Sequence, residues 1–159
     1  MPDIPGDGKL RVDWVPAIAN KNAPTTTELN AGIRVSQWMT SDGFVGFRPE
    51  TADVPTSGME DTFDTSTNGR RSYSGTVLRF KKQSGSDAVY STMVPDATGF
   101  IVERRSMAAA TAYASGQPVK VYPVICGETA WLDQEPNTVE RFEVPLKMTA
   151  QPNLRAAVA

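Results

Sequence analysis

The sequence lacks most of the residues that enzymes use for chemistry. Its 159 residues include no histidine and one cysteine, so the commonest general base and the commonest metal ligand are both missing. One cysteine can form neither an intrachain disulfide nor a thiolate zinc site. There is no P-loop, and Gly6, Asp7 and Gly8 lack the third glycine of a dinucleotide-binding fingerprint. We therefore expect no enzymatic activity, no catalytic or metal-binding residue and no cofactor.

Long apolar runs and an excess of basic charge are also absent. No run approaches the ~20 apolar residues of a membrane span, and the polar N-terminus does not fit a signal peptide. The net charge of −2 is unlike that of a general nucleic-acid binder. Cys126 follows apolar strand residues, which predicts a buried thiol and a chain made in a reducing cytosol. We expect no membrane partner and no nucleic-acid-binding residue.

What the sequence does contain is a strict alternation of apolar and polar residues. Phe142, Val144, Leu146 and Met148 alternate with neighbours that include Arg141, Glu143 and Lys147, as in a strand with one buried face. The pattern predicts a mainly β fold, an antiparallel sandwich or barrel of about six to eight strands. One short flanking helix is expected at about 86–94, with Ser86 as its N-cap. The expected strands lie at about 9–15, 33–39, 74–83, 98–105, 117–126 and 138–149.

Residues 40–73 form the least regular stretch and are expected to be a long loop. Asn68 and Gly69 are a strong signal for a two-residue hairpin turn, with a short strand on each side. A loop of this length inside a compact domain is usually functional or disordered. Its apolar residues need something to pack on, which is either the domain's own core or a neighbouring chain. These residues are Phe44, Phe47, Met59 and Phe63.

The ends of the chain are expected to be arms on a single domain that spans residues 1–159. Residues 1–8 contain two prolines and two glycines, and residues 151–159 end in small apolar residues. Such segments can gain order when they meet a neighbouring chain. Residues 106–115 are ambiguous, because their alanines suit a helix but also suit a loop packed closely against another subunit.

Three pairs of neighbouring basic residues occur: Arg70 with Arg71, Lys81 with Lys82, and Arg104 with Arg105. Adjacent strand residues face opposite sides, so such a pair does not form a patch by itself. One interpretation is that these charges guard strand ends and edges against unwanted pairing. The other is that they form salt bridges between subunits.

Two other functions fit parts of the sequence. Trp131 lies in a predicted turn with Glu128, Asp133 and Glu135 nearby, which is a possible sugar-binding surface of an adhesin-like β-sandwich. A glycosidase would need a pair of carboxylates, and the densest acidic group is Asp133, Glu135, Glu140 and Glu143. Solvated loop charge is the simpler explanation of those carboxylates. Trp14 lies on the apolar face of its strand, so a core position is expected.

Six short segments, taken in order, carry a resemblance to a known family. They are residues 23–24, 27–32 (TELNAG), 42–43, 75–80 (GTVLRF), 99–105 (GFIVERR) and 117–124 (QPVKVYPV). From about residue 20 onward the chain resembles the major tail (tail tube) proteins of long, flexible-tailed bacteriophages, especially those of actinobacterial hosts. It departs from many relatives at Gln117, where they have an aspartate, and it has no additional immunoglobulin-like domain.

The resemblance implies a structural virion protein of the tail, made in the cytoplasm of the bacterial host. Copies would form hexameric rings that stack into a tube, through which double-stranded DNA is ejected without specific binding. In that family the long loop and the arms join one ring to the next. Further expected partners are the tape measure, tail terminator and distal tail proteins. The expected contact residues between subunits or rings are Asp3, Ile4, Phe44, Phe47, Met59, Phe63, Arg70, Arg71, Leu154 and Arg155.

Overall fold

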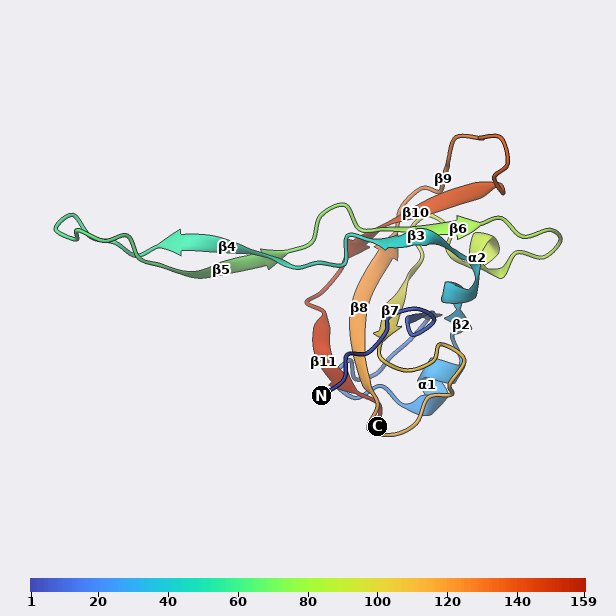
Figure 1. Ribbon diagram of the computed structural model, residues 1–159, viewed down its shortest axis with the longest axis horizontal. Coiled ribbons are helices and arrows are strands. Elements are labelled where there is room, and N and C mark those ends of the chain that lie inside the picture. Colours follow the sequence, from blue (N-terminus) through green and yellow to red (C-terminus); the bar gives the residue numbers. More distant parts are fainter.

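A curled antiparallel sheet forms the body of the molecule, and a long hairpin projects from it (Figure 1). The structure is a computed structural model that describes residues 1–159. Two short helices and a 3₁₀ turn, Val35–Trp38, complete it. The helices are α1 (Thr26–Asn30) and α2 (Ala88–Thr92), and the strands are β1 (Arg11–Val15), β2 (Ile33–Arg34), β3 (Met39–Val45), β4 (Glu50–Pro55), β5 (Ser66–Ser72), β6 (Val77–Lys81), β7 (Thr98–Arg104), β8 (Pro118–Cys126), β9 (Ala130–Trp131), β10 (Arg141–Met148) and β11 (Asn153–Ala157).

The sheet runs in the order β2-β1-β7-β8-β10-β6-β3, with β11 added to β8 and β9 added to β10. Strand β10 joins the two halves, because its first residues pair with β6 and its last residues pair with β8. A strand shared in this way bends the sheet around the core and produces a half-barrel. The prediction of a mainly β, antiparallel fold is confirmed.

The alternation in β10 reflects burial of one of its faces. Phe142, Val144 and Leu146 are buried, whereas Lys147 is exposed. Phe142 lies opposite Phe80 of β6, and the two ring centroids are 5.6 Å apart. Cross-strand pairs of this kind stabilise a sheet and fix its register.

The central strand β8 is buried on both faces. Val119 and Val121 belong to one hydrophobic cluster, and Tyr122, Val124 and Cys126 belong to the other. This explains the nearly continuous apolar run of its sequence, which is typical of strands covered on both sides. The predicted burial of Cys126 is confirmed, and burial raises the pKa of its thiol to about 11. Trp14 also lies in the core, as expected.

Helix α2 is present at the predicted place but is shorter than predicted. Its N-cap is Asp87 rather than Ser86. The Asp87 carboxylate accepts hydrogen bonds from the backbone N–H groups of Tyr90 (3.0 Å) and Gln83 (2.9 Å). The aspartate therefore fixes both the start of the helix and the turn before it.

Besides the expected helix, the structure has a second short one, α1. The Thr25 hydroxyl accepts a hydrogen bond from the Glu28 N–H at 3.2 Å, and the Glu28 carboxylate accepts one from the Thr25 N–H at 2.9 Å. This reciprocal capping box supports a helix too short to be recognised by its periodicity. The strand expected at 33–39 is likewise divided by the 3₁₀ turn, and residues 106–115 form a loop.

The C-terminal segment is extended, but it is not a free arm. Strand β11 pairs with β8, and Ala156 and Val158 are buried against the second hydrophobic cluster. The expectation that residues 151–159 order only against a neighbour is therefore wrong. Residues 1–8 lie outside any strand and are exposed. The two termini lie near each other, beside β11 (Figure 1).

Candidate assembly interface

The hairpin formed by β4 and β5 has no partner within the chain. The two strands pair only with each other, and every residue from 48 to 72 except Ser57 and Gly69 is exposed. The prediction of a long loop at 40–73 is thus wrong, because strands β3, β4 and β5 occupy most of it. An isolated two-stranded ribbon is only marginally stable in water, which makes this hairpin a candidate contact surface.

Asn68 and Gly69 do not form the turn of this hairpin. They lie inside β5, at a bulge where Gly69 and Arg70 lie opposite Ala52. A Cβ atom on Gly69 would lie 3.0 Å from the carbonyl oxygen of Ala52 and 3.0 Å from Cγ2 of Val54. The glycine thus suits a close backbone approach at a bulge and does not form a tight turn.

The tip of the hairpin, residues 56–65, is held by its own hydrogen bonds. The hydroxyl oxygens of Thr56 and Thr65 lie 2.7 Å apart, and the N–H of Gly58 donates to the Asp61 carboxylate at 2.6 Å. In this conformation Met59 is fully exposed and Phe63 is 79% exposed. The tip therefore presents two large apolar side chains to solvent, both among the predicted contact residues.

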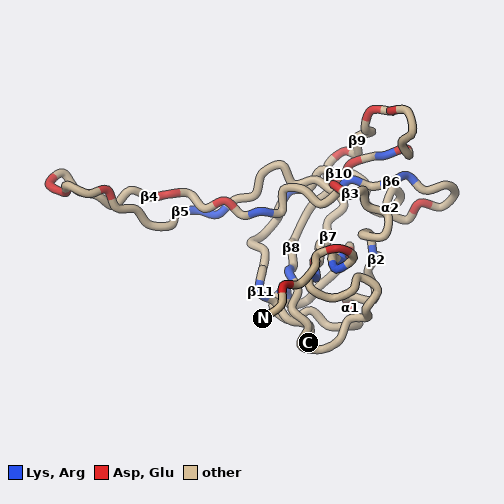
Figure 2. The backbone as a smooth tube through the Cα atoms, viewed as in Figure 1, with Lys and Arg blue, Asp and Glu red and all other residues tan.

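The outer part of the hairpin is also acidic. Residues 53–65 contain Asp53, Glu60, Asp61 and Asp64 and no basic residue. Figure 2 shows these carboxylates at and near the free end of the hairpin, while the basic residues of β5 lie toward the body. The tip thus combines negative charge with exposed apolar groups.

The base of the hairpin is fixed to the core. Gly46 has a φ of 80°, and a Cβ there would lie 2.6 Å from the Thr76 Cα. Only glycine therefore permits this close approach of the two backbone segments. The Thr76 hydroxyl donates to the Gly46 carbonyl oxygen at 2.9 Å. Phe44 and Phe47 stack at 4.2 Å, and Phe47 contacts Tyr122 edge-on at 5.0 Å. These two phenylalanines therefore pack on the chain's own core.

A groove of about 1330 Å³ lies between the hairpin base and the segment that joins β10 to β11. Strands β10 and β11 both pair with the same strand, β8, and residues 149–152 connect them. Four basic residues line the groove, and no acidic residue does; they are Arg70, Arg71, Lys147 and Arg155. The groove brings together four of the predicted contact residues, Arg70, Arg71, Leu154 and Arg155, whereas the sequence analysis missed Lys147.

None of these four basic side chains forms an ion pair or a hydrogen bond within the chain. Other cations do find partners: Lys82 lies 3.5 Å from Asp87, and Arg105 pairs with Glu103. The groove of this slightly acidic protein is therefore a concentration of unneutralised positive charge.

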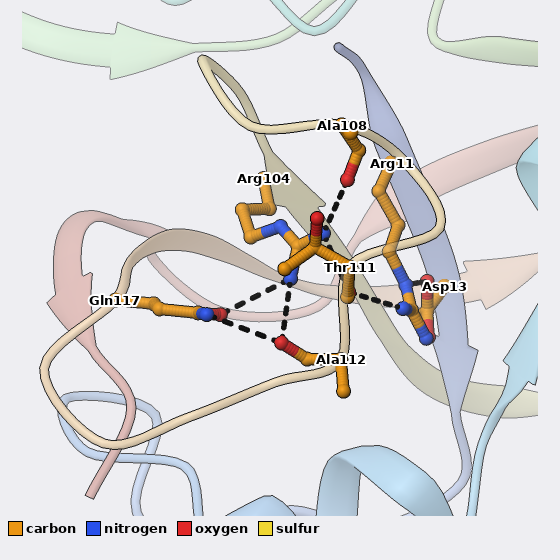
Figure 3. Close-up of polar contacts among 7 residues, drawn as sticks. All are labelled: Arg11, Asp13, Arg104, Ala108, Thr111, Ala112 and Gln117. Carbon is orange, nitrogen blue, oxygen red and sulfur yellow. Dashed lines mark hydrogen bonds and ion pairs between the residues drawn. The ribbon is translucent and has the colours of Figure 1, made fainter. Parts of the chain in front are cut away.

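Arg104 has a different role from that expected for a charged residue at a strand end. It is fully buried and donates hydrogen bonds to the carbonyl oxygens of Ala108 (3.0 Å), Thr111 (2.8 Å) and Ala112 (3.4 Å) and to the side chain of Gln117 (3.1 Å) (Figure 3). The edge-guarding interpretation is wrong for this arginine. It organises the 105–116 loop from inside.

The remaining candidate residues lie away from the groove. Asp3 and Ile4 are exposed on the N-terminal segment. Trp131 is 49% exposed, and its ring centroid lies 5.7 Å from that of Tyr90 and 5.9 Å from that of Phe142. Of the carboxylates near it, Glu135 lies 3.7 Å from Arg141. No three acidic or cysteine side chains converge as metal ligands would, and neither helix is long and apolar enough to cross a membrane.

Comparison with known proteins identifies the family and the fold of the chain. No curated protein shows significant sequence similarity to the chain. A chain of the anti-feeding prophage baseplate, solved by cryo-EM with 6-fold symmetry imposed, has the same fold with a TM-score of 0.65. That likeness covers 98% of each chain at 9% sequence identity. The family model described as phage tail tube protein matches residues 1–159. The chain belongs to the phage tail tube protein family, and is a structural component of a virion tail.

Proposed function

We propose that this protein is the tail tube subunit of a long, flexible-tailed phage of an actinobacterial host. Copies form hexameric rings in the host cytoplasm, and the rings stack into the conduit for DNA ejection. The observation that carries the proposal is the hairpin, whose base is fixed to the core and whose ordered tip contacts nothing else in the chain. A strand rises about 3.3 Å per residue, so the tip reaches on the order of 30 Å beyond the start of β4.

Charge supports a conduit rather than a nucleic-acid binder. Each lysine or arginine on the lumen wall that neutralised a phosphate would add affinity and slow the passage of DNA. A chain with net charge −2 is compatible with a wall along which DNA slides. The basic groove is compatible with this function only if protein covers it in the tube. The tape measure, tail terminator and distal tail proteins are the further partners we propose.

Sedimentation velocity and negative-stain electron microscopy of the purified chain test the proposal. The expected result is a concentration-dependent change from monomers to rings and tubes. A chain that stays monomeric at the highest soluble concentration, even with a tail initiator complex, would contradict it.

A sugar-binding function is disfavoured by the position of Trp131, whose ring packs on Tyr90 and Phe142. Substitution of Trp131 by alanine separates the two functions. We expect tubes to form and no glycan to be bound before or after the change. Glycan binding by the wild type that the substitution abolishes would support the adhesin alternative.

A further inference from the structure

We propose that the basic groove is the receptor for the acidic hairpin tip of another copy of this chain. This inference rests on the proposed function and identifies which two surfaces meet when the tube assembles. The tip is residues 56–65, and the groove lies between the hairpin base and the β10–β11 connection.

Charge is the first argument. The groove carries four basic side chains and no acidic one, and none of the four has an ionic partner in its own chain. The tip carries Glu60, Asp61 and Asp64 with no basic residue, and no cation pairs with them within the chain. Opposite charges arranged in this way on two surfaces steer association and select the partner.

Apolar contact is the second argument. Met59 and Phe63 are the large apolar groups of the tip, and both are exposed. The groove contains the half-buried side chains of Tyr73, Met148 and Leu154. An apolar centre with a charged rim is the usual composition of a specific protein interface. The tip and the groove are therefore complementary in both charge and apolar surface.

Geometry excludes the chain's own tip as the occupant. Arg70 and Arg71 of the groove lie on the same hairpin, near its base, while the tip points away from the body (Figures 1 and 2). The packing of Phe44 and Phe47 fixes the base, so the hairpin cannot fold back. The N-terminal segment is a weaker candidate, because Lys9 offsets part of the charge of Asp3 and Asp7.

Charge reversal on both surfaces tests the proposal. The tip variant carries Glu60→Lys and Asp64→Lys; Asp61 is kept because it accepts the Gly58 N–H within the turn. The groove variant carries Arg70→Glu, Lys147→Glu and Arg155→Glu. The matched control carries Asp133→Lys and Glu140→Lys, which change exposed carboxylates outside both surfaces.

Each reversal alone is expected to raise the critical concentration for tube formation at least about tenfold, because like charges are brought together. Combining both reversals in one chain is expected to restore most of the assembly, and the control is expected to assemble like the wild type. Circular dichroism checks that every variant is folded. Restored assembly in the combined variant requires that these two surfaces meet.

Cross-linking is an independent readout. Cys126 is buried, so new exposed cysteines can be oxidised selectively. A chain with Met59→Cys and Arg155→Cys, both at exposed positions, is expected to form covalent ladders when its tubes are oxidised, and each single substitution is expected to give no ladder. The matched pair Met59→Cys with Asp133→Cys is also expected to give none.

Several results would overturn the proposal. If the wild type assembles but the reversals do not interfere, or if the combined variant fails, the tip docks elsewhere and the tail tube function still stands. If the groove variant loses binding to a 30-base-pair duplex while its tubes form normally, the groove is a nucleic-acid surface. If the wild type never assembles, the proposed function fails and the inference fails with it.

Discussion

At the scale of single residues, buried polar side chains determine the irregular parts of this fold. Arg104 satisfies three backbone carbonyl oxygens and Gln117 in a loop with no regular structure. Its guanidinium also lies 5.0 Å from the centroid of the Tyr113 ring. The Thr111 carbonyl oxygen also accepts a hydrogen bond from Arg11 (3.0 Å), and that of Ala112 accepts one from Gln117 (3.1 Å). A small network centred on Arg104 thus holds residues 105–116 in place without a helix.

Substitution of Arg104 by methionine keeps much of the volume but removes every donor. We expect the free energy of unfolding to fall by about 2–4 kcal/mol, because the four hydrogen bonds that the buried guanidinium donates are lost together. Urea denaturation of the monomer measures this change. Arg48→Met, at an exposed arginine, is the control and is expected to change stability by less than about 0.5 kcal/mol. An equal effect of both substitutions would contradict the assigned role.

Asp87 should make stability depend on pH. Burial by itself would raise the pKa of its carboxyl group, but hydrogen bonds from Tyr90 and Gln83 and the charge of Lys82 outweigh burial and lower it. Its stabilisation is therefore present above the pKa of about 3.9 in the unfolded chain and is lost as the pH falls through the lower folded-state pKa.

Asp87→Asn isolates this effect, because asparagine is also a good N-cap but does not titrate in this range. We expect the wild type to be more stable than the variant at pH 7 and the difference to shrink below about pH 4. Urea denaturation across pH 2.5–7 measures both. A stability difference that does not change with pH would show that the charge of Asp87 contributes nothing.

At the scale of elements, the sequence predicted the strands whose residues follow a regular pattern. The alternation in β10 correctly placed Phe142, Val144 and Leu146 on one buried face. The turn predicted at Asn68 and Gly69 is wrong, because the same dipeptide suits both a hairpin turn and a close backbone approach at a bulge. Strand β11 was not predicted, because a short segment rich in alanine has no period, and only its position beside β8 makes it a strand.

The groove could not be predicted from the sequence for similar reasons. Arg70, Arg71, Leu154 and Arg155 were expected to make contacts, but their convergence in one groove depends on pairing between distant strands. Lys147 looked like an ordinary polar residue of β10. Phe44 and Phe47 were indistinguishable in sequence from Met59 and Phe63, yet only the first pair reaches the core.

Truncations should distinguish the two ends of the chain. Removal of residues 153–159 takes away β11 and the buried side chains of Ala156 and Val158. We expect the free energy of unfolding to fall by at least about 2 kcal/mol, since full burial of one valine is worth roughly 1.5–3 kcal/mol. Removal of residues 1–8 should leave stability within about 0.5 kcal/mol, because these residues are exposed. Thermal and urea denaturation measure the stability of the two truncated chains. Equal stability would contradict the packing of β11 on the body.

The hairpin can be tested as a separate element. Replacing residues 56–65 with a two-residue turn removes the tip but leaves β4, β5 and the whole body intact. Because the tip contacts nothing else in its chain, we expect an unchanged melting temperature and complete loss of tube formation. Calorimetry and electron microscopy give the two readouts. Normal tubes from the shortened chain would exclude the tip from assembly.

At the scale of the whole molecule, charge is unevenly distributed. The chain has a net charge of −2, and its free hairpin end carries acidic residues (Figure 2), as does the 128–140 segment. The groove, in contrast, is lined by four basic residues and no acidic one. The tips of two copies carry like charges, and so do their grooves, which disfavours tip-to-tip and groove-to-groove contacts. Such a molecule is expected to remain soluble as a monomer and to associate in one orientation.

Assembly should therefore weaken as salt is added. The Debye length falls from about 10 Å at 0.1 M to about 3 Å at 1 M, so attraction between the tip and the groove is screened. We expect the critical concentration for tubes to rise severalfold between these salt concentrations. Light scattering at increasing protein concentration measures it. A critical concentration that falls with salt would indicate that apolar contact alone drives assembly.

The most direct test of the account is a cryo-EM reconstruction of tubes assembled from the purified chain. The account predicts stacked rings of six subunits, with residues 56–65 of each hairpin seated against Arg70, Arg71, Lys147 and Arg155 of a subunit in an adjacent ring. Tubes in which the tip lies in solvent or on another surface would contradict the docking, and a chain that forms no tube would contradict the function.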